Sequence, residues 1–218
     1  MTDGPELTSF PDGFFDRYDP SPDADFYRSA RLVTHLDDDA IAAVGELYAE
    51  LGVDGSVPGR RVLDLMSSWV SHLSSPPAEL VVLGMNAAEL TENPMATHQV
   101  VQDLNSDPHL PFSDASFDAV LCCVSVDYLI APVEVLREVS RVLRPEAPVV
   151  LTYSNRCFPT KAVRGWLAAD DAGRGDIVVR YLARAGGFTE PELSLRTPSG
   201  WRHQGDPLYA VTARRLTG

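Results

Sequence analysis

The sequence predicts a single α/β domain built on a doubly wound sheet. From Arg61 onward, short apolar runs alternate with helical patterns, an order typical of strands joined by right-handed helical crossovers. Most of these runs are continuously apolar, which indicates strands buried on both faces of a parallel sheet. With 218 residues, of which 44% are hydrophobic, the chain is long enough for one sizeable core.

The chain before the first strand predicts a helical cap. We expect residues 1–57 to form this cap as part of the same domain as residues 58–218, which carry the sheet. Asp37 is a good N-cap for a helix that runs to Leu51, and Gly52 follows it as a C-cap glycine. The preceding segment, ADFYRSARLVTHL, is aromatic and basic, and we expect a short helix or an ordered lid there.

The remaining elements follow in order. The first five strand candidates are VLDL, ELVVLG, HQVVQ, FDAVLCCV and APVVLTY. Residues 132–143 give the clearest helix, because a proline suits its first turn, an apolar stripe follows, and Pro145 stops it. Helical patterns also cover residues 160–169 and the region near 176–185, and LSLR and PLYAVTARR close the chain as strands.

Composition excludes several classes of protein. The formal net charge of −13 disfavours nucleic acid and anionic membranes as partners. Three cysteines, Cys122, Cys123 and Cys157, do not suggest a disulfide framework. Adjacent strand residues face opposite sides, so Cys122 and Cys123 are poorly placed to chelate one ion and we predict no metal site. The amino terminus lacks a signal-peptide pattern, and we expect a cytoplasmic protein.

Polar residues close three successive strand candidates. Asp64, Asn86 and Asp103 stand at these ends, where ligands of open α/β sheets bind. The pattern predicts a crevice for an adenosine-containing cofactor, although each residue has a plain structural alternative as a capping or loop-ordering group. Asn86 offers only one acceptor oxygen for ribose hydroxyls, and Glu89, one helical turn later, could supply a carboxylate instead.

Five segments in this order resemble one family. VLDL, LGMN, VVQDL, LPFSDASFDAVLCC and LREVSRVLRPEAPVVLTYSN are similar to the motifs of class I S-adenosylmethionine-dependent methyltransferases, and within them to the type 11 group. The resemblance covers about residues 61–155, with a variant first motif. It implies a Rossmann-like sheet of seven strands, the last antiparallel, with helices on both faces, and S-adenosyl-L-methionine as cofactor.

The resemblance also implies which residues contact the cofactor. The first turn would lie beside the methionine part, the second strand end would face the ribose, the third the adenine, and the fourth would border the methyl-transfer site. The matching residues are Asp64, Met66, Ser67 and Ser68 at the first turn, Asn86 at the end of the second strand, Asp103 and Leu104 after the third strand, and Cys122 and Cys123 at the end of the fourth strand.

This chain departs from the family pattern where glycines are usual. The first turn usually reads D-x-G-x-G-x-G, and here Met66, Ser68 and Val70 take the glycine places. Glu146 also stands in a usual glycine pair. Either the turn follows another path, with serine hydroxyls bonding the cofactor's carboxylate, or the pocket is partly closed and the protein is a non-catalytic relative. A nicotinamide-dependent oxidoreductase is disfavoured because no G-x-G-x-x-G is present.

The function that this resemblance implies is methyl transfer, and we expect a small-molecule acceptor. A general base is needed only where the acceptor is a poor nucleophile. His35 and Tyr27, in the segment expected to cover the pocket, are the catalytic candidates, and Arg31 or Arg156 would pair with an anionic substrate. We expect a small molecule as the partner and allow for a homodimer. The alternative is a methyltransferase-like binding protein with a degenerate cofactor pocket.

Overall fold

The computed structural model describes residues 9–197 and 205–217, which build one seven-stranded sheet. Its strands are β1 (Arg61–Leu65), β2 (Glu79–Gly84), β3 (His98–Val101), β4 (Ala119–Cys123), β5 (Pro148–Tyr153), β6 (Glu192–Leu195) and β7 (Tyr209–Arg214). They lie in the order β3-β2-β1-β4-β5-β7-β6. The first five pair in parallel, whereas β7 is antiparallel to β5 and β6. The predicted doubly wound sheet with an antiparallel last strand is confirmed.

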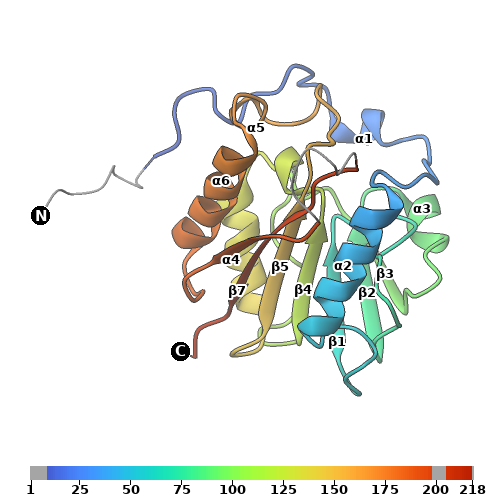
Figure 1. The fold of residues 1–218 in the computed structure, drawn as a ribbon. Helices are drawn as coiled ribbons and strands as arrows, with labels where there is room; N and C mark the ends of the chain where they lie inside the picture. Colours follow the sequence, from blue (N-terminus) through green and yellow to red (C-terminus); the bar gives the residue numbers. More distant parts are fainter. Residues whose placement is uncertain (1–8, 198–204, 218) are drawn as a thin grey trace, which may run out of the picture.

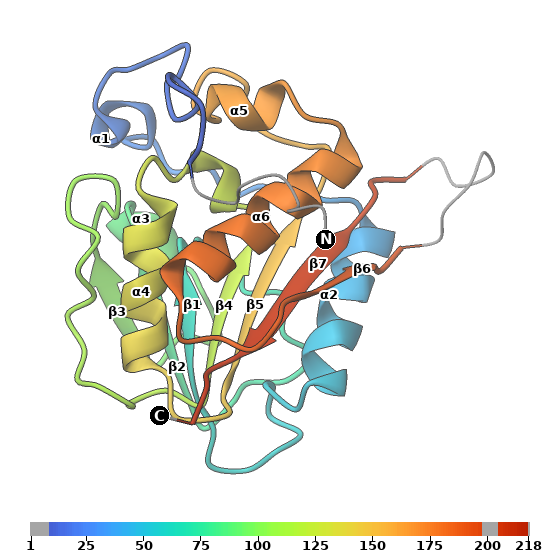
Figure 2. The same ribbon diagram turned by 90° about the vertical axis from the view of Figure 1, so that its left-hand side faces the viewer.

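Helices cover both faces of the sheet. They are α1 (Asp23–Phe26), α2 (Asp38–Glu50), α3 (Ala87–Thr91), α4 (Pro132–Val142), α5 (Arg164–Leu167) and α6 (Asp171–Ala185), with a 3-10 helix η1 (Val126–Tyr128). Figures 1 and 2 show α2 on one face and α4 and α6 on the other. In both views α1, the segment after it and α5 lie over one end of the strands, and this is the end at which the parallel strands finish.

The core consists of two hydrophobic clusters, one on each face of the sheet. Leu63 and Val120 pack with the apolar sides of α4 and α6, whereas their neighbours Val62 and Leu121 pack with α2. This division follows from the strand period of two residues, which sends successive side chains to opposite faces. Since each fully buried Leu or Val stabilises the fold by roughly 1.5–3 kcal/mol, the continuous apolar runs fix the strand positions.

Helix ends agree with the sequence where a capping group is present. The Asp37 carboxylate accepts a hydrogen bond from the Ala40 N–H at 2.9 Å and begins α2, as predicted. α6 begins at Asp171, before the region near 176 that periodicity indicated, because Asp170 caps it by accepting from the Gly173 N–H at 2.8 Å. The helix predicted over residues 160–169 is limited to the four residues of α5, since residues 158–162 form a turn instead.

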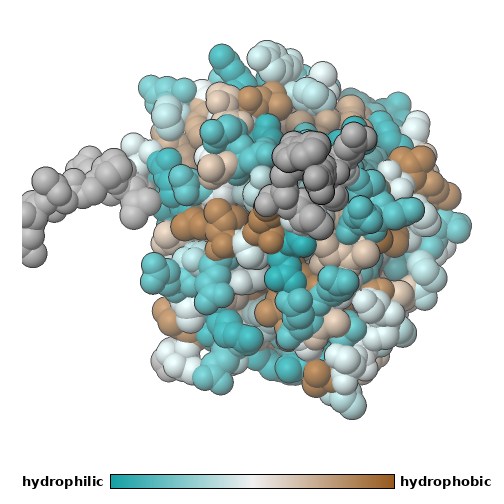
Figure 3. Space-filling model, in the orientation of Figure 1, coloured by the Kyte–Doolittle hydropathy of each residue, from teal (hydrophilic) through white to brown (hydrophobic). Residues whose placement is uncertain are grey.

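The surface of the molecule mixes polar and apolar residues. Figure 3 shows one face of the molecule as a mixture of hydrophilic residues and small hydrophobic groups. The edge strand β6 contributes exposed Leu193 and Leu195. In the part of the chain that the structure describes, no helix combines the length and hydropathy needed to span a bilayer.

Candidate functional site

A cavity of about 440 Å³ lies at the carboxyl ends of the parallel strands. Its volume falls within the range of roughly 300–1,000 Å³ typical of small-molecule sites. Its floor comes from the segments that follow β1, β2, β3 and β4, and its other walls come from the loop after β5 and from the segment around and after α1. Residues 23–36, which we call the cap segment, supply Asp23, Tyr27, Arg31, Val33, Thr34, His35 and Leu36 to the lining.

The turn after β1 is organised by Asp64. Its carboxylate accepts hydrogen bonds from the hydroxyls of Ser67 and Ser71, both at 2.6 Å, and its side chain is buried. Burial raises the pKa of Asp64 to about 6 even though both hydroxyls favour its charged form. We expected Asp64 either to contact a ligand or to order its loop. Its hydrogen bonds to Ser67 and Ser71 show that it orders the turn. Asp64 also lines the cavity.

The altered glycine places of this turn have different backbone conformations. Met66 has φ +56°, so the first place keeps the left-handed conformation that favours glycine. Ser68 and Val70 are not among the described residues with positive φ, so the β-branched Val70 avoids the left-handed conformation that would strain it. Gly84 allows the turn to lie close to β2, because a Cβ there would meet the Ser67 carbonyl oxygen at 2.2 Å.

The altered turn leaves the cavity open. Met66 and Trp69 lie in its lining, and the Trp69 indole N–H donates to the Val33 carbonyl of the cap segment at 3.1 Å. Ser67 and Ser68 also line the cavity, and their hydroxyls donate to Asp64 and to Glu89. Since these protons are engaged, the serine oxygens present lone pairs, which suit an ammonium group better than a carboxylate.

At the end of β2, the Asn86 side chain is used within the fold. Its oxygen caps α3 by accepting from the N–H groups of Ala88 and Glu89, at 3.0 and 3.2 Å. Its amide donates to the carbonyl of Tyr27 in the cap segment at 2.8 Å. Asn86 lines the cavity where the sequence placed it, but it acts there as a helix cap and as an anchor for the cap segment.

Glu89 supplies a carboxylate one helical turn after Asn86. It is only 9% exposed and lines the cavity. One oxygen accepts from the Arg31 backbone N–H at 2.8 Å, and the other accepts from the Ser68 hydroxyl at 2.6 Å. Glu89 therefore joins the cap segment to the turn after β1.

The loop after β3 holds the two residues expected beside an adenine. Asp103 and Leu104 both line the cavity. The Asp103 carboxylate accepts from the Asn105 N–H at 2.9 Å and from the Ser106 hydroxyl at 2.7 Å, so it also orders its own loop. Leu104 is buried and belongs to the core cluster on the α4 side.

Only one of the two adjacent cysteines, Cys122 and Cys123, lines the cavity. Cys123 lines it, and burial raises the pKa of its thiol to about 12. Cys122 does not line it, which corrects the expectation that both would border the site. Because adjacent strand residues point to opposite faces, Cys122 lies fully buried in the cluster under α4 and α6. Val124, which follows, has φ +42° and turns the chain into the cavity wall.

The two catalytic candidates, Tyr27 and His35, both lie in the cavity lining. Burial, with the nearby Asp23 carboxylate, raises the pKa of Tyr27, so its phenol stays protonated and is not a general base near pH 7. Partial desolvation lowers the pKa of His35, so its imidazole is neutral near pH 7 and can accept a proton. The His35 ring meets Phe158 edge-on at 5.2 Å between centroids.

The two arginines expected to meet an anionic substrate also line the cavity, each with partners in the chain. The Arg31 guanidinium donates to the Phe26 carbonyl at 2.9 Å and lies over the Phe26 ring at 4.6 Å. Arg156 is paired with Asp206 at 2.8 Å through its Nε.

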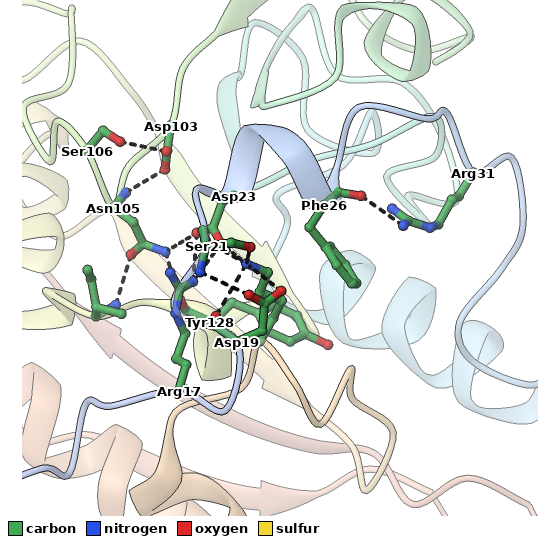
Figure 4. A network of polar contacts seen from close by, with 12 residues as sticks. Arg17, Asp19, Ser21, Asp23, Phe26, Arg31, Asp103, Asn105, Ser106 and Tyr128 are labelled. Carbon is green, nitrogen blue, oxygen red and sulfur yellow. Dashed lines mark hydrogen bonds and ion pairs between the residues drawn. The ribbon is translucent and has the colours of Figure 1, made fainter.

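A buried polar network fixes the start of the cap segment, as Figure 4 shows. The Asp23 carboxylate accepts hydrogen bonds from the Arg17 guanidinium at 2.7 and 2.8 Å and from the Asn105 side-chain amide at 2.8 Å. Lys161, the one lysine in the sequence, is fully buried and lies 3.3 Å from the same carboxylate. Through Asn105, which also binds Asp103, the cap segment is linked to the loop after β3.

Sequence reasoning missed two parts of this site. The roles of Asp23, Asn105 and Lys161 depend on contacts between segments far apart in the chain, although a single lysine in an arginine-rich protein was a signal. The second part is His72, which the sequence does not distinguish from the other histidines. It lines the cavity with φ +54°, and burial lowers its pKa.

Comparison with protein families identifies the central part of the chain. Residues 72–151 match the methyltransferase domain family. The match begins just after the altered turn, in agreement with the departures found there. A search of curated protein sequences found no match.

Solved structures share the fold. An S-adenosylmethionine-dependent methyltransferase from Mesorhizobium loti has a TM-score of 0.55 at 17% identity, over 80% of this chain and 100% of that one. The trans-methyltransferase CalH in complex with SAH has a TM-score of 0.59 at 15% identity, over 81% of this chain and 58% of that one. The 4+2 cyclase SpnF has a TM-score of 0.55 at 15% identity, over 80% and 81%. These structures confirm the fold that the resemblance implied, and the family match agrees with the resemblance over residues 72–151.

Proposed function

We propose that this protein transfers a methyl group from S-adenosylmethionine to a small molecule, because residues 72–151 match the methyltransferase domain family and the sheet has the fold of S-adenosylmethionine-dependent methyltransferases. The observation that carries the proposal is the open cavity at the strand ends, lined by Asp64, Ser68, Glu89 and Asp103. The alternative is a degenerate pocket, which bulky side chains of the altered turn would fill. Met66 and Trp69 are the bulky side chains of this turn, and both line the cavity.

The lining fits the cofactor's parts. Ser67 and Ser68 offer oxygen lone pairs beside two carboxylates, a setting that suits the ammonium of an amino-acid tail. Asp103 and Leu104 offer an acceptor and an apolar surface for an adenine ring. When bound, the cofactor supplies an already activated methyl group on a sulfonium, so the protein's task is mainly to position the acceptor.

The cavity wall opposite the sheet carries groups that could contact a small acceptor. The floor carries three acids, Asp64, Glu89 and Asp103, together with His72. The cap segment and the loop after β5 contribute Asp23, Arg31, His35 and Arg156. His35 would take the proton of an acceptor hydroxyl or amine, because its neutral imidazole is open to the cavity. Tyr27 would donate a hydrogen bond to the acceptor and not act as a base.

A second candidate is a binding or non-methylating protein on the same fold. The likeness to SpnF, a 4+2 cyclase, supports this second candidate, because one fold can host several reactions. The two candidates differ in whether methyl transfer accompanies cofactor binding. Methylation of an added acceptor by the purified protein would exclude the non-catalytic alternative.

Calorimetric titration with S-adenosylhomocysteine tests cofactor binding. We expect micromolar affinity for the wild-type protein and no binding of NADH. Asp103→Ala should weaken binding by about 1–3 kcal/mol, because a buried amine of the ligand loses its acceptor. Asp107→Ala is the matched control, since Asp107 is an exposed acid of the same loop that also accepts a backbone hydrogen bond, from His109. No binding at millimolar ligand would contradict the proposal.

A further inference from the structure

The residue at the end of β2 has no group left for a sugar. In open α/β sheets an acid near this position accepts hydrogen bonds from ribose hydroxyls of a bound nucleotide. Here the Asn86 oxygen already accepts two N–H groups of α3, and its amide donates to the Tyr27 carbonyl. To bind a ribose, Asn86 would have to break its hydrogen bonds to the start of α3 or its hydrogen bond to Tyr27 of the cap segment.

The carboxylate of Glu89 remains able to accept. A carboxylate has about four acceptor sites, and the contacts with Arg31 and Ser68 use one on each oxygen. The side chain lines the cavity between the turn after β1 and the cap segment. Glu92, the next acid along the chain, follows the end of α3 and is exposed. Glu89 is therefore the acid of the β2–α3 segment that reaches the cavity.

The other acids in the lining are less well placed for a ribose. Asp64 lies at the end of β1, where both of its hydrogen-bonding partners belong to the neighbouring turn. Asp103 lies in the loop after β3, on the other side of β2 in the sheet order, beside the position proposed for the adenine. Asp23 is held by Arg17, Asn105 and Lys161.

We infer that Glu89 determines specificity for the ribose of the cofactor, by accepting hydrogen bonds from its hydroxyls in place of Asn86. This inference rests on the proposed use of S-adenosylmethionine. The same carboxylate also has a second role, because one of its oxygens accepts a hydrogen bond from the Arg31 backbone N–H. Ribose binding and placement of the cap segment are thus joined at one side chain.

The test compares S-adenosylhomocysteine with its 2′-deoxy and 3′-deoxy analogues by calorimetry. Wild-type protein should bind at least one deoxy analogue about 10-fold more weakly than the parent, since a hydrogen bond to a charged group is lost. In Glu89→Ala this ratio should fall to about 1, and Glu89→Gln, which keeps a neutral acceptor, should give an intermediate ratio. The ratio is measured within one variant, so a general loss of affinity cancels.

Asn86→Ser is the matched control. Serine keeps an acceptor for the cap of α3 but loses the amide that binds Tyr27, and the wild-type ratio should persist. A ratio that is unchanged in Glu89→Ala, with all three ligands weakened equally, would show that Glu89 only positions the cap segment. A ratio that collapses in Asn86→Ser instead would return the ribose to Asn86. Failure of wild-type protein to bind any of the three ligands would overturn the proposed function itself.

Discussion

Replacement of Lys161 by methionine should lower the free energy of unfolding by about 3 kcal/mol, the scale expected when a buried ion pair loses one partner. The Lys161 ammonium is fully buried and donates to the Ser21 carbonyl at 2.7 Å, with the carboxylates of Asp19 and Asp23 at 3.1 and 3.3 Å. Methionine would fill similar space without satisfying these acceptors. Chemical denaturation at neutral pH measures the change.

Arg164→Met is the matched control for this prediction. Arg164 stands three residues later and its side chain is 60% exposed, with Asp16 at 3.9 Å. An exposed pair of this kind contributes about 0–1 kcal/mol. Because Lys161 binds residues 19–23, its replacement should also speed hydrogen exchange of backbone amides in the cap segment. Equal stabilities of the two variants would show that the buried network does not hold this segment.

Replacement of Asp127 by asparagine should change the pH dependence of stability. Asp127 is 2% exposed, and one of its carboxylate oxygens has no hydrogen-bond partner. Burial raises the pKa of Asp127 to about 8, well above the value of about 4 for an unfolded chain. The folded protein therefore holds this proton to higher pH than the unfolded chain does.

The sign of the effect follows from that difference in proton affinity. Stability from the neutral carboxyl is fully present below about pH 4 and is lost as the pH rises through about 8. Asp127→Asn removes this loss, so its stability relative to wild type should rise by about 2–4 kcal/mol between pH 5 and pH 8. Denaturation curves at both pH values measure it, and a difference between the proteins that does not vary with pH would contradict the assignment.

Much of the fold followed from local patterns. Continuous apolar runs predicted four of the five parallel strands, and Asp37 and Pro132 marked the starts of α2 and α4. The start of α6 was missed because the sequence DAGRGD contains two glycines, which weaken a helical pattern. Tertiary packing requires one of them, since a Cβ at Gly175 would meet Leu193 at 2.5 Å. A local propensity rule cannot include that contact.

The site was predictable as a location more than as a set of contacts. Asp64, Asn86 and Asp103 were placed at one edge of the sheet from their positions after strands, and all three line the cavity. Their hydrogen bonds could not be read from the sequence, because Tyr27 meets Asn86 across 59 positions. The adjacent cysteines are the opposite case. Alternation along the strand places Cys122 and Cys123 on opposite faces, so the sequence alone indicated that only one of them could line the cavity.

The altered first turn has lost its glycines, but one of the three places still has a left-handed backbone. Met66 has the left-handed backbone that glycine would take, and Glu146, at the other altered glycine place, does so as well with φ +64°. Gly84 still allows the close approach between the turn and β2. The polar groups of the site have instead been rearranged, with Ser68 and Glu89 bonded to each other above the strand ends.

A crystal structure of the protein with S-adenosylhomocysteine would test the central claim most directly. The expected density places the amino-acid tail within hydrogen-bond distance of Ser67 or Ser68, and the adenine beside Asp103 and Leu104. The contradicting result is a cavity in which Met66 and Trp69 occupy that volume and the nucleoside is absent at saturating ligand.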